Sequence, residues 1–225
     1  MTLHLRNPET FGEEFYLITN PEKYGFNPFD RYNGVSLVLR KRWSDSWQLV
    51  ASWDIGKAES STAQGYNGTT NTYDNPNEDF NRAGLTVWDR THIVKATGTY
   101  LFAEPVGVNL GAFLRVHTGQ PLLRWVEFFG YEGLKYGWDY LRAAPPGEDT
   151  IGGERYDTVA LLDLRAEKQF TLGRWGSLRV IADVFNVFNN NTVTNQETTS
   201  GPYWGDIYDL VQPRVIRLGF AWDYG

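Results

Sequence analysis

The chain has 225 residues, no cysteine and a formal net charge of −6 at pH 7. The absence of cysteine excludes disulfides and thiolate chemistry, and the acidic balance without a basic stripe argues against nucleic-acid binding. A helical membrane span is also excluded, because the mean hydropathy is −0.44 and no run of about 18 apolar residues occurs.

The first 30 residues are weakly patterned. Residues 12–20 are compatible with one strand, and the Asn- and Pro-rich stretch that follows is typical of a loop. Met1 is not followed by the cationic start and apolar core of an export signal. We therefore expect either that such a signal was removed or that the chain is a piece of a longer protein.

Strict alternation of apolar and polar residues begins at residue 32. It predicts strands over 32–42 and 47–58, joined by a very short turn at Ser44, Asp45 and Ser46. Residues 59–88, rich in Ser, Thr, Asn, Gly and Asp, predict a long polar loop. Alternation returns over 92–102 and 108–120, on either side of the short turn AEPVG, and a second long loop is predicted over 121–158.

The clearest hairpin is predicted between residues 159 and 189, with Gly173 and Gly176 marking its turn. A third long loop is expected over 190–212, followed by a last strand over 215–224. Large apolar residues occupy every second position of that strand: Ile216, Leu218, Phe220, Trp222 and Tyr224. Such a face is not left in water.

Strand length and loop length together predict the architecture. Each run has about a dozen residues, the length with which a strand tilted by about 45° crosses a bilayer. The connections alternate between short and long, so an antiparallel meander gathers all long loops at one end. Aromatic residues, 16% of the chain, cluster near the strand ends as interfacial girdles do. We predict an all-β transmembrane barrel of about eight strands, with short periplasmic turns and long extracellular loops.

Several runs, in this order, resemble the C-terminal part of TonB-dependent outer-membrane receptors. They are YNGVSLVLRKRWSDSWQLVASWDIGKAE, DRTHIVKATGTYLF, LRVHTGQPL, DLRAEKQFTLGRWGSLRVIADVFNVFN and PRVIRLGFAWDYG. The chain is most similar to the subgroup that carries an N-terminal carboxypeptidase-regulatory-like domain. We interpret 1–225 as one β-barrel segment, in which 1–30 is the weakly patterned start and 31–225 supplies strands and loops.

The resemblance implies a function and partners. Receptors of this family take up siderophores, glycans, peptides or similar nutrients, driven by an energy-coupling protein of the inner membrane. The expected partners are outer-membrane lipid, the plug and other strands of the receptor, the coupling protein through the missing N-terminal part, and the barrel-assembly machinery. No plug or coupling box is present in the sequence, so transport by this chain alone is not expected. The alternative is a stand-alone eight-strand barrel that acts as an adhesin or surface-binding module.

Two groups of residues are candidates for a role in the barrel. Charges on one strand parity are expected to face the lumen, as a compensating network or as a transport pathway: Asp163, Arg165, Glu167, Arg179, Asp183 and Arg217. Aromatic residues beside a cation in the second long loop are candidates for ligand binding, although loop packing explains them equally: Arg124, Trp125, Tyr131, Tyr136, Trp138 and Tyr140. Phe220, Trp222 and Tyr224 are expected to form the C-terminal signal for assembly.

Catalytic, metal and cofactor sites are not expected. His4, His92 and His117 are scattered and lack the spacing of metal ligands, and Asp74, Glu78 and Asp79 lack the spacing of a calcium loop. The sequence shows no combination of nucleophile, base and orienting group, so an enzyme is not predicted.

Overall fold

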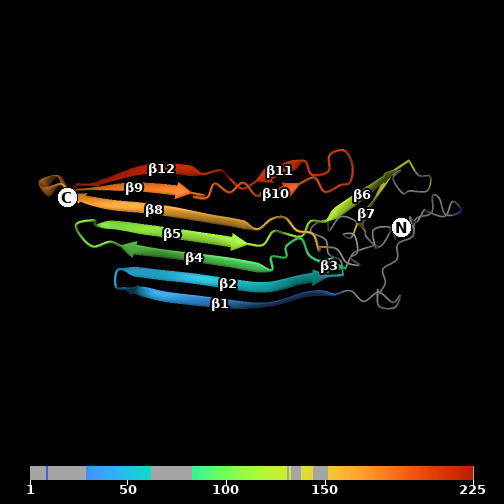
Figure 1. Ribbon diagram of the computed structural model, residues 1–225, viewed down its shortest axis with the longest axis horizontal. Helices are drawn as coiled ribbons and strands as arrows, with labels where there is room; N and C mark the ends of the chain where they lie inside the picture. The colour runs from blue at the N-terminus through green and yellow to red at the C-terminus, as the bar shows by residue number, and fades with distance from the viewer. Residues whose placement is uncertain are drawn as a thin grey trace.

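In the computed structural model the chain forms one long antiparallel sheet with its loops gathered at one end (Figure 1). The structure describes residues 9, 29–61, 83–130, 132, 138–143 and 152–224. The long strands are β1 (Asp30–Ser44), β2 (Trp47–Ser60), β4 (His92–Leu101), β5 (Val108–His117), β8 (Val159–Thr171), β9 (Ser177–Phe185) and β12 (Val215–Asp223).

The sheet is a meander in the order β1-β2-β4-β5-β8-β9-β12, with the short β3 (Gly84–Leu85) paired to the end of β2. All seven strands predicted from residue 32 onward are confirmed. Three of them end earlier than predicted, β4 at Leu101, β5 at His117 and β12 at Asp223. With β3, the sheet has eight strands. The possible strand at 12–20 lies outside the described residues.

The turns at the other end of the sheet are short, as predicted. Asp45 and Ser46 have φ angles of 51° and 70°, the two positive values of a type I′ turn, which matches the twist of the strands that it joins. Between β8 and β9, a short 3-10 helix spans Gly173–Trp175. Gly176 follows with a φ of 85°, and a side chain there would collide with the carbonyl oxygen of Asp223.

The long loops contain more regular structure than the sequence predicted. Within 121–158, β6 (Arg124–Phe129) pairs with β7 (Trp138–Ala143). Within 190–212, β10 (Val193–Gln196) pairs with β11 (Ile207–Leu210) through an irregular register. The expectation of loops without strands is thus wrong for these two segments. The sequence did not indicate these strands because none of them carries a run of strict alternation: β6 reads RWVEFF, β7 WDYLRA, β10 VTNQ and β11 IYDL.

The register gives the sheet one apolar face and one polar face, because directly paired residues share a side. The residues of the apolar face are, strand by strand, Val35, Leu37 and Leu39; Leu49, Ala51, Trp53 and Ile55; Val94 and Ala96; Leu110, Ala112, Leu114 and Val116; Ala160, Leu162, Leu164 and Ala166; Val180, Ala182 and Val184; and Ile216, Leu218, Phe220 and Trp222.

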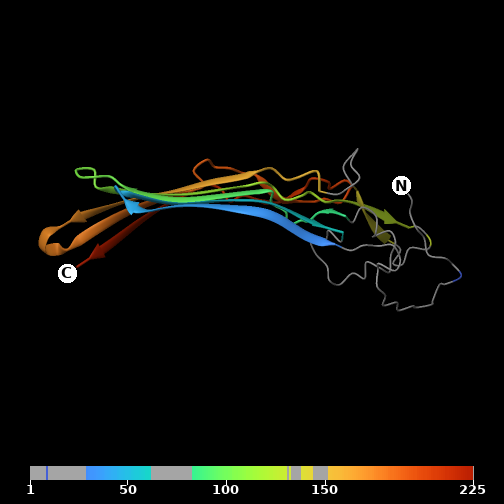
Figure 2. The same ribbon diagram turned by 90° about the horizontal axis from the view of Figure 1, so that it is seen from below.

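This apolar face is not covered by any second layer of the described chain. Figure 2 shows the sheet as a thin curved layer. Leu123 and Val159 are the buried hydrophobic residues of the described part, whereas Leu218, Phe220 and Trp222 are 67%, 70% and 62% exposed. An apolar surface of this size requires an apolar environment.

The sheet is open in the described part of the chain. β1 and β12 lie at its two edges, and closure between them is not observed. None of the helical segments in the described residues has the length and apolar character needed to span a membrane.

Candidate functional site

The predicted lumen charges all lie on the polar face of the sheet. The register sets Arg165, Asp183 and Arg217 side by side across β8, β9 and β12. Arg217 donates two hydrogen bonds to Asp183 Oδ2, from Nε at 3.0 Å and from a terminal nitrogen at 2.7 Å. Arg165 approaches Asp183 Oδ1 at 3.7 Å. The carboxylate of Asp183, only 5% exposed, is therefore held between two guanidinium groups.

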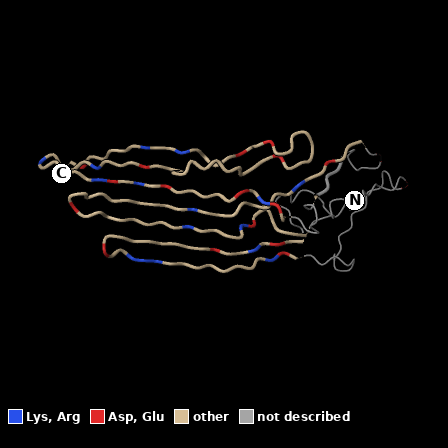
Figure 3. Tube along the Cα trace, in the orientation of Figure 1, with Lys and Arg blue, Asp and Glu red and all other residues tan. Residues whose placement is uncertain are grey.

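The remaining charges of this group also find partners. Arg165 contacts Glu167 at 3.5 Å, and Arg179 contacts Asp223 at 3.4 Å. Figure 3 shows acidic and basic positions alternating along β8 and its neighbours. Because these arginine side chains are 39% to 62% exposed, each contact contributes little to stability. The arrangement is that of a mutually compensating network.

Asp163 has a different role from the other five residues, because its partner is the backbone. Its Oδ1 accepts a hydrogen bond of 2.8 Å from the amide nitrogen of Asn186. Asn186, 4% exposed, has a φ of 50° and donates from Nδ2 to the carbonyls of Asn190 and Gln212 at 2.9 and 2.7 Å. This network fixes the exit of β9. Sequence reasoning missed Asn186, although asparagine tolerates the left-handed conformation more readily than most residues.

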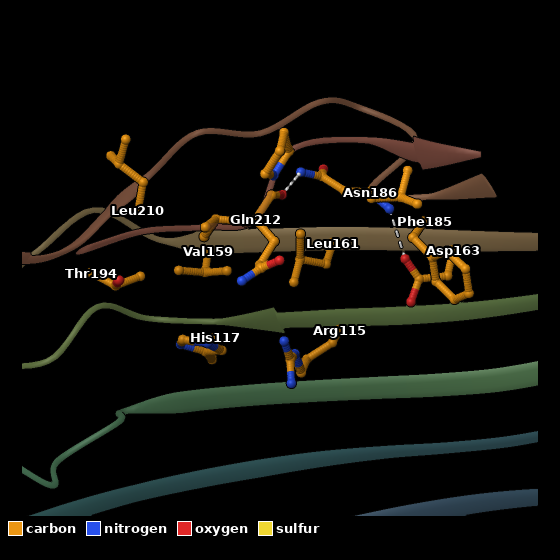
Figure 4. Close-up of a pocket in the computed structure, with 13 residues that line it drawn as sticks. Arg115, His117, Val159, Leu161, Asp163, Phe185, Asn186, Thr194, Leu210 and Gln212 are labelled. Carbon is orange, nitrogen blue, oxygen red and sulfur yellow. Dashed lines mark hydrogen bonds between the residues drawn. The ribbon is translucent and has the colours of Figure 1, made fainter. Parts of the chain in front are cut away.

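A cavity of about 510 Å³ lies where this network meets the polar face (Figure 4). Strand residues form one side and the end of the third long loop forms the other. Its lining includes Arg115, His117, Asp163, Asn186 and Gln212. His117 Nδ1 lies 3.1 Å from the carbonyl oxygen of Thr118. The cavity combines cationic and amide groups with apolar walls, so it can accept a polar solute or a side chain from another segment.

Of the predicted aromatic cluster, Arg124 and Trp125 begin β6. The Arg124 guanidinium lies 4.6 Å from the centre of the Trp204 ring, and its Nε donates to Ser200 Oγ at 3.0 Å. Trp125 exchanges backbone hydrogen bonds with Thr198 and Ser200. These contacts join two long loops.

The other members of that cluster are only partly described. Trp138 and Tyr140 lie on β7, in register with Phe129 and Glu127 respectively. Tyr131 and Tyr136 lie outside the described residues. The role of this cluster in ligand binding remains a prediction.

In the third long loop, Glu197 holds the β10–β11 hairpin. Its carboxylate accepts hydrogen bonds from the hydroxyl of Tyr208 at 2.7 Å and from the amide of Thr199 at 2.6 Å. These bonds, that of Tyr208 first, lower the pKa of Glu197 to about 2. The same contact raises the pKa of Tyr208.

An ion pair that the sequence did not reveal joins the segments where the long loops meet the sheet. Asp89, 2% exposed, accepts a hydrogen bond of 2.7 Å from the amide of Ala58 and forms a short ion pair with Arg155. Arg155 also donates to the carbonyl of Gly119 at 3.0 Å. Asp89 thus connects the end of β2 with the segments that follow β5 and precede β8.

Replacing Asp89 with Asn is expected to weaken the connection between the end of β2 and the segments that follow β5 and precede β8, because Arg155 then loses its anionic partner. Disrupting a buried hydrogen-bonded group costs about 1–3 kcal/mol. Hydrogen exchange on the natural protein in its membrane or detergent should therefore become faster at the Ala58 amide and across 152–158. Asp157→Asn changes an exposed carboxylate of the same loop and serves as the control. Equal hydrogen-exchange rates in the two variants would contradict this role of the Asp89–Arg155 ion pair.

Of the predicted assembly residues, Phe220 and Trp222 lie on the apolar face of β12, and Tyr224 follows the end of the strand. Phe220, Trp222 and Tyr224 are 70%, 62% and 70% exposed. Trp222 Nε1 donates a 2.8 Å hydrogen bond to the carbonyl of Trp175 in the β8–β9 turn, and its ring lies 6.0 Å from that of Tyr224. Within the described residues there is no group of three or more potential metal-ligating side chains.

Comparison with known proteins gave one similar sequence and two similar structures. The TonB-dependent transporter Oar of Myxococcus xanthus is 25% identical over 200 residues, which are 82% of this chain and 18% of the transporter. The ferripyoverdine receptor of the Pseudomonas aeruginosa outer membrane, bound to ferripyoverdine, has a TM-score of 0.47 at 13% identity, covering 85% of this chain and 19% of the receptor. A second structure, P. aeruginosa FpvA with a heterologous pyoverdine, has a TM-score of 0.48 at 14% identity, with the same coverage. No protein-family model matches the chain.

The sequence relationship supports the expected resemblance at the level of a TonB-dependent receptor barrel and the expected location in the bacterial outer membrane. The chain spans less than a fifth of the length of the transporter that it resembles. The subgroup with a carboxypeptidase-regulatory-like domain is not confirmed. The sequence relative is a transporter, which agrees with the prediction that this chain is not an enzyme.

Proposed function

We propose that this chain supplies part of the barrel wall and three extracellular loops of a TonB-dependent receptor of the outer membrane. The observation that carries the proposal is the apolar face, which continues across all seven long strands without a covering layer in the described residues. Lipid is the environment that such a face fits. The opposite face, with its paired charges, fits a wet lumen.

The two ends of the sheet support an orientation. The tight turns at 45–46, 102–107 and 172–176 fit the periplasmic rim, and the segments that hold the β6–β7 and β10–β11 hairpins fit the extracellular rim. Contacts such as that of Arg124 with Trp204 bind the loops to one another. We infer that these loops contribute to the capture of a nutrient such as a siderophore, glycan or peptide. The aromatic residues of the second long loop are the candidates for that contact.

The two edges of the sheet support a role within a larger wall. Open strand edges are not tolerated in lipid, because each unpaired backbone group costs several kcal/mol. β1 and β12 therefore pair with strands beyond this segment. A plug inside the completed barrel and an energy-coupling protein below it are the partners that complete the transport cycle.

The size of the natural protein tests this proposal. We expect an antibody against residues 125–140 to detect, in the outer-membrane fraction of the source organism, a band several times heavier than 25.7 kDa. A band in the soluble fraction would overturn the proposal. A band at 25.7 kDa in the outer membrane, with migration that changes on heating, would replace it with the stand-alone barrel that acts as an adhesin or binding module.

A further inference from the structure

A second cavity, of about 500 Å³, lies on the apolar face of the sheet, toward the end with the tight turns. Small residues form its floor across four adjacent strands, with Gly98 of β4 opposite Ala112 of β5, and Ala166 of β8 opposite Ala182 of β9. Larger side chains border this floor, among them those of Trp47, Tyr100 and Leu164. Together they form an open groove with apolar walls, which we call the apolar groove.

Two lysines lie on the apolar face beside this groove. Lys41 of β1 is directly opposite Leu49, which lines the groove. Lys168 of β8 is the next residue on the same face after Ala166, which forms part of the floor. Figure 3 shows basic positions near the turn end of both strands. The groove is therefore apolar inside and has positive charge along its border.

The charge of these two lysines is not compensated within the described part of the chain. Among the described residues, neither Lys41 nor Lys168 has an ion pair. At the opposite end of the same face the arrangement differs, because Arg31 and Lys57 both pair with Glu59, at 3.0 and 2.7 Å. An excess of positive charge on this face is thus confined to the end with the tight turns.

Both amines are directed toward the turns. Lys41 Nζ donates to the carbonyls of Ser44 and Trp47 at 2.9 and 3.1 Å and lies 4.0 Å from the centre of the Trp47 ring, so it holds one wall of the groove. Lys168 Nζ donates to two carbonyls of the β4–β5 turn, the nearer at 2.8 Å on Val106. An ammonium group has three donors, so Lys168 retains one for a further acceptor. Long cationic side chains at the edge of a bilayer place their charge at the polar boundary in this way.

We propose that the apolar groove and its two lysines bind an anionic phospholipid of the periplasmic leaflet. One acyl chain lies along the floor of the groove, the phosphate accepts a hydrogen bond from Lys168, and Lys41 adds a second positive charge. The inference rests on the proposed function, which places the apolar face in lipid and the tight turns at the periplasmic rim. The cavity volume lies in the range of about 300–1,000 Å³ that is typical of small-molecule sites.

A polypeptide fits this groove less well than a lipid. Each strand beneath it, from β2 to β9, is already paired on both sides within the sheet. A polypeptide lying on the groove would therefore find no backbone partners, and unpaired backbone groups in the hydrocarbon region cost several kcal/mol each. An acyl chain has no hydrogen-bonding groups to satisfy, and the single polar end of the lipid meets the lysines at the rim.

Native mass spectrometry of the natural protein, purified from outer membranes in a mild detergent, tests this inference. The protein is titrated with phosphatidylglycerol and with phosphatidylethanolamine that carry the same acyl chains. We expect one phosphatidylglycerol to bind at least about fivefold more tightly than phosphatidylethanolamine, the gain expected for one lysine beside an anionic headgroup. Migration that changes on heating verifies that each sample is folded.

A change of charge tests the role of Lys168. In Lys168→Gln the preference for phosphatidylglycerol should fall by about fivefold, because the free donor and its charge are lost. Lys57→Gln is the matched control, since it neutralises a lysine of the same face at the opposite end of the sheet, where Arg31 still pairs with Glu59. This control should bind both lipids as the natural protein does.

A change of shape tests the groove itself. Ala112→Phe fills the floor, so the affinity for both lipids should fall roughly tenfold, the loss expected when about two methylene groups no longer fit. Ala160→Phe makes the same change on the apolar face of β8, outside the groove, and should leave both affinities unchanged.

The outcomes separate this inference from the proposed function. Equal binding of the two lipids by the natural protein, or equal effects of Ala112→Phe and Ala160→Phe, would overturn the site and leave a barrel with unselective lipid contacts. Displacement of the lipid by an equal concentration of soluble glycerol phosphate would also overturn it, because the groove would then contribute nothing. Absence of the protein from outer membranes overturns the proposed function itself.

Discussion

Deletion of residues 220–224 is expected to abolish assembly of the natural protein in the outer membrane. β12 pairs with β9 along its whole length, from Val215 opposite Phe185 to Asp223 opposite Ser177. The deletion removes the partner of the N-terminal half of β9 and the hydrogen bond from Trp222 to Trp175. Unpaired backbone groups in the bilayer cost several kcal/mol each, so the wall cannot close. Immunoblots of purified outer membranes, before and after heating, measure the assembled fraction.

A deletion of equal length provides the control for this experiment. Residues 201–205 connect β10 and β11 outside the sheet; 201–203 are exposed, and Trp204 is the half-buried partner of Arg124. Their removal is expected to loosen the contact between the two long loops but to leave assembly intact, because every long strand of the sheet keeps its neighbours. Normal insertion of the variant that lacks 220–224 would mean that the second half of β12 is not needed to complete the wall.

Replacing Leu37 with Arg is expected to destabilise the assembled barrel by about 2–4 kcal/mol, the cost of an arginine on a lipid-facing position near the bilayer midplane. Leu37 is 53% exposed on the apolar face of β1, opposite Trp53 of β2. On a water-facing sheet, the same substitution would cost little. Denaturant titration of the purified protein in lipid vesicles measures the change in the free energy of unfolding.

Ser36, the residue before Leu37, lies on the opposite face of β1 and provides the control. Ser36 is also exposed, lies on the polar face and donates a hydrogen bond to Asp54. Ser36→Arg places a cation directly opposite that carboxylate, so we expect a change well below that of Leu37→Arg. Equal effects of the two substitutions would mean that the apolar face does not contact lipid.

The strands were predictable from sequence because each carries its own period-two pattern. Runs such as Val35, Leu37 and Leu39 determine which side chains share a face before any partner strand is known. The hairpins of the long loops were not predictable in this way. Val193–Gln196 and Ile207–Leu210 are short, and their pairing shifts in register, so no alternating pattern marks them.

The candidate sites were also predictable only in part. Alternation alone places Asp163 and Asp183 on the polar face, but it does not predict their partners. Asp163 accepts a hydrogen bond from a backbone amide, whereas Asp183 is contacted by two arginines. Only the register decides those partners. The ion pair between Asp89 and Arg155, which are 66 residues apart, was also not predictable, because no local pattern in either segment indicates a buried ion pair.

Local sequence specifies the strand pattern and the alternation of short and long connections, and hence the two faces of the sheet. These follow from local chemistry, since a strand sends successive side chains to opposite sides whatever it pairs with. The tertiary structure decided which charges compensate and which do not. Lys95 and Arg115 are ordinary polar-face residues in the sequence, and only the pairing of β4 with β5 brings the two cations together, beyond the reach of the acids on β9 and β12.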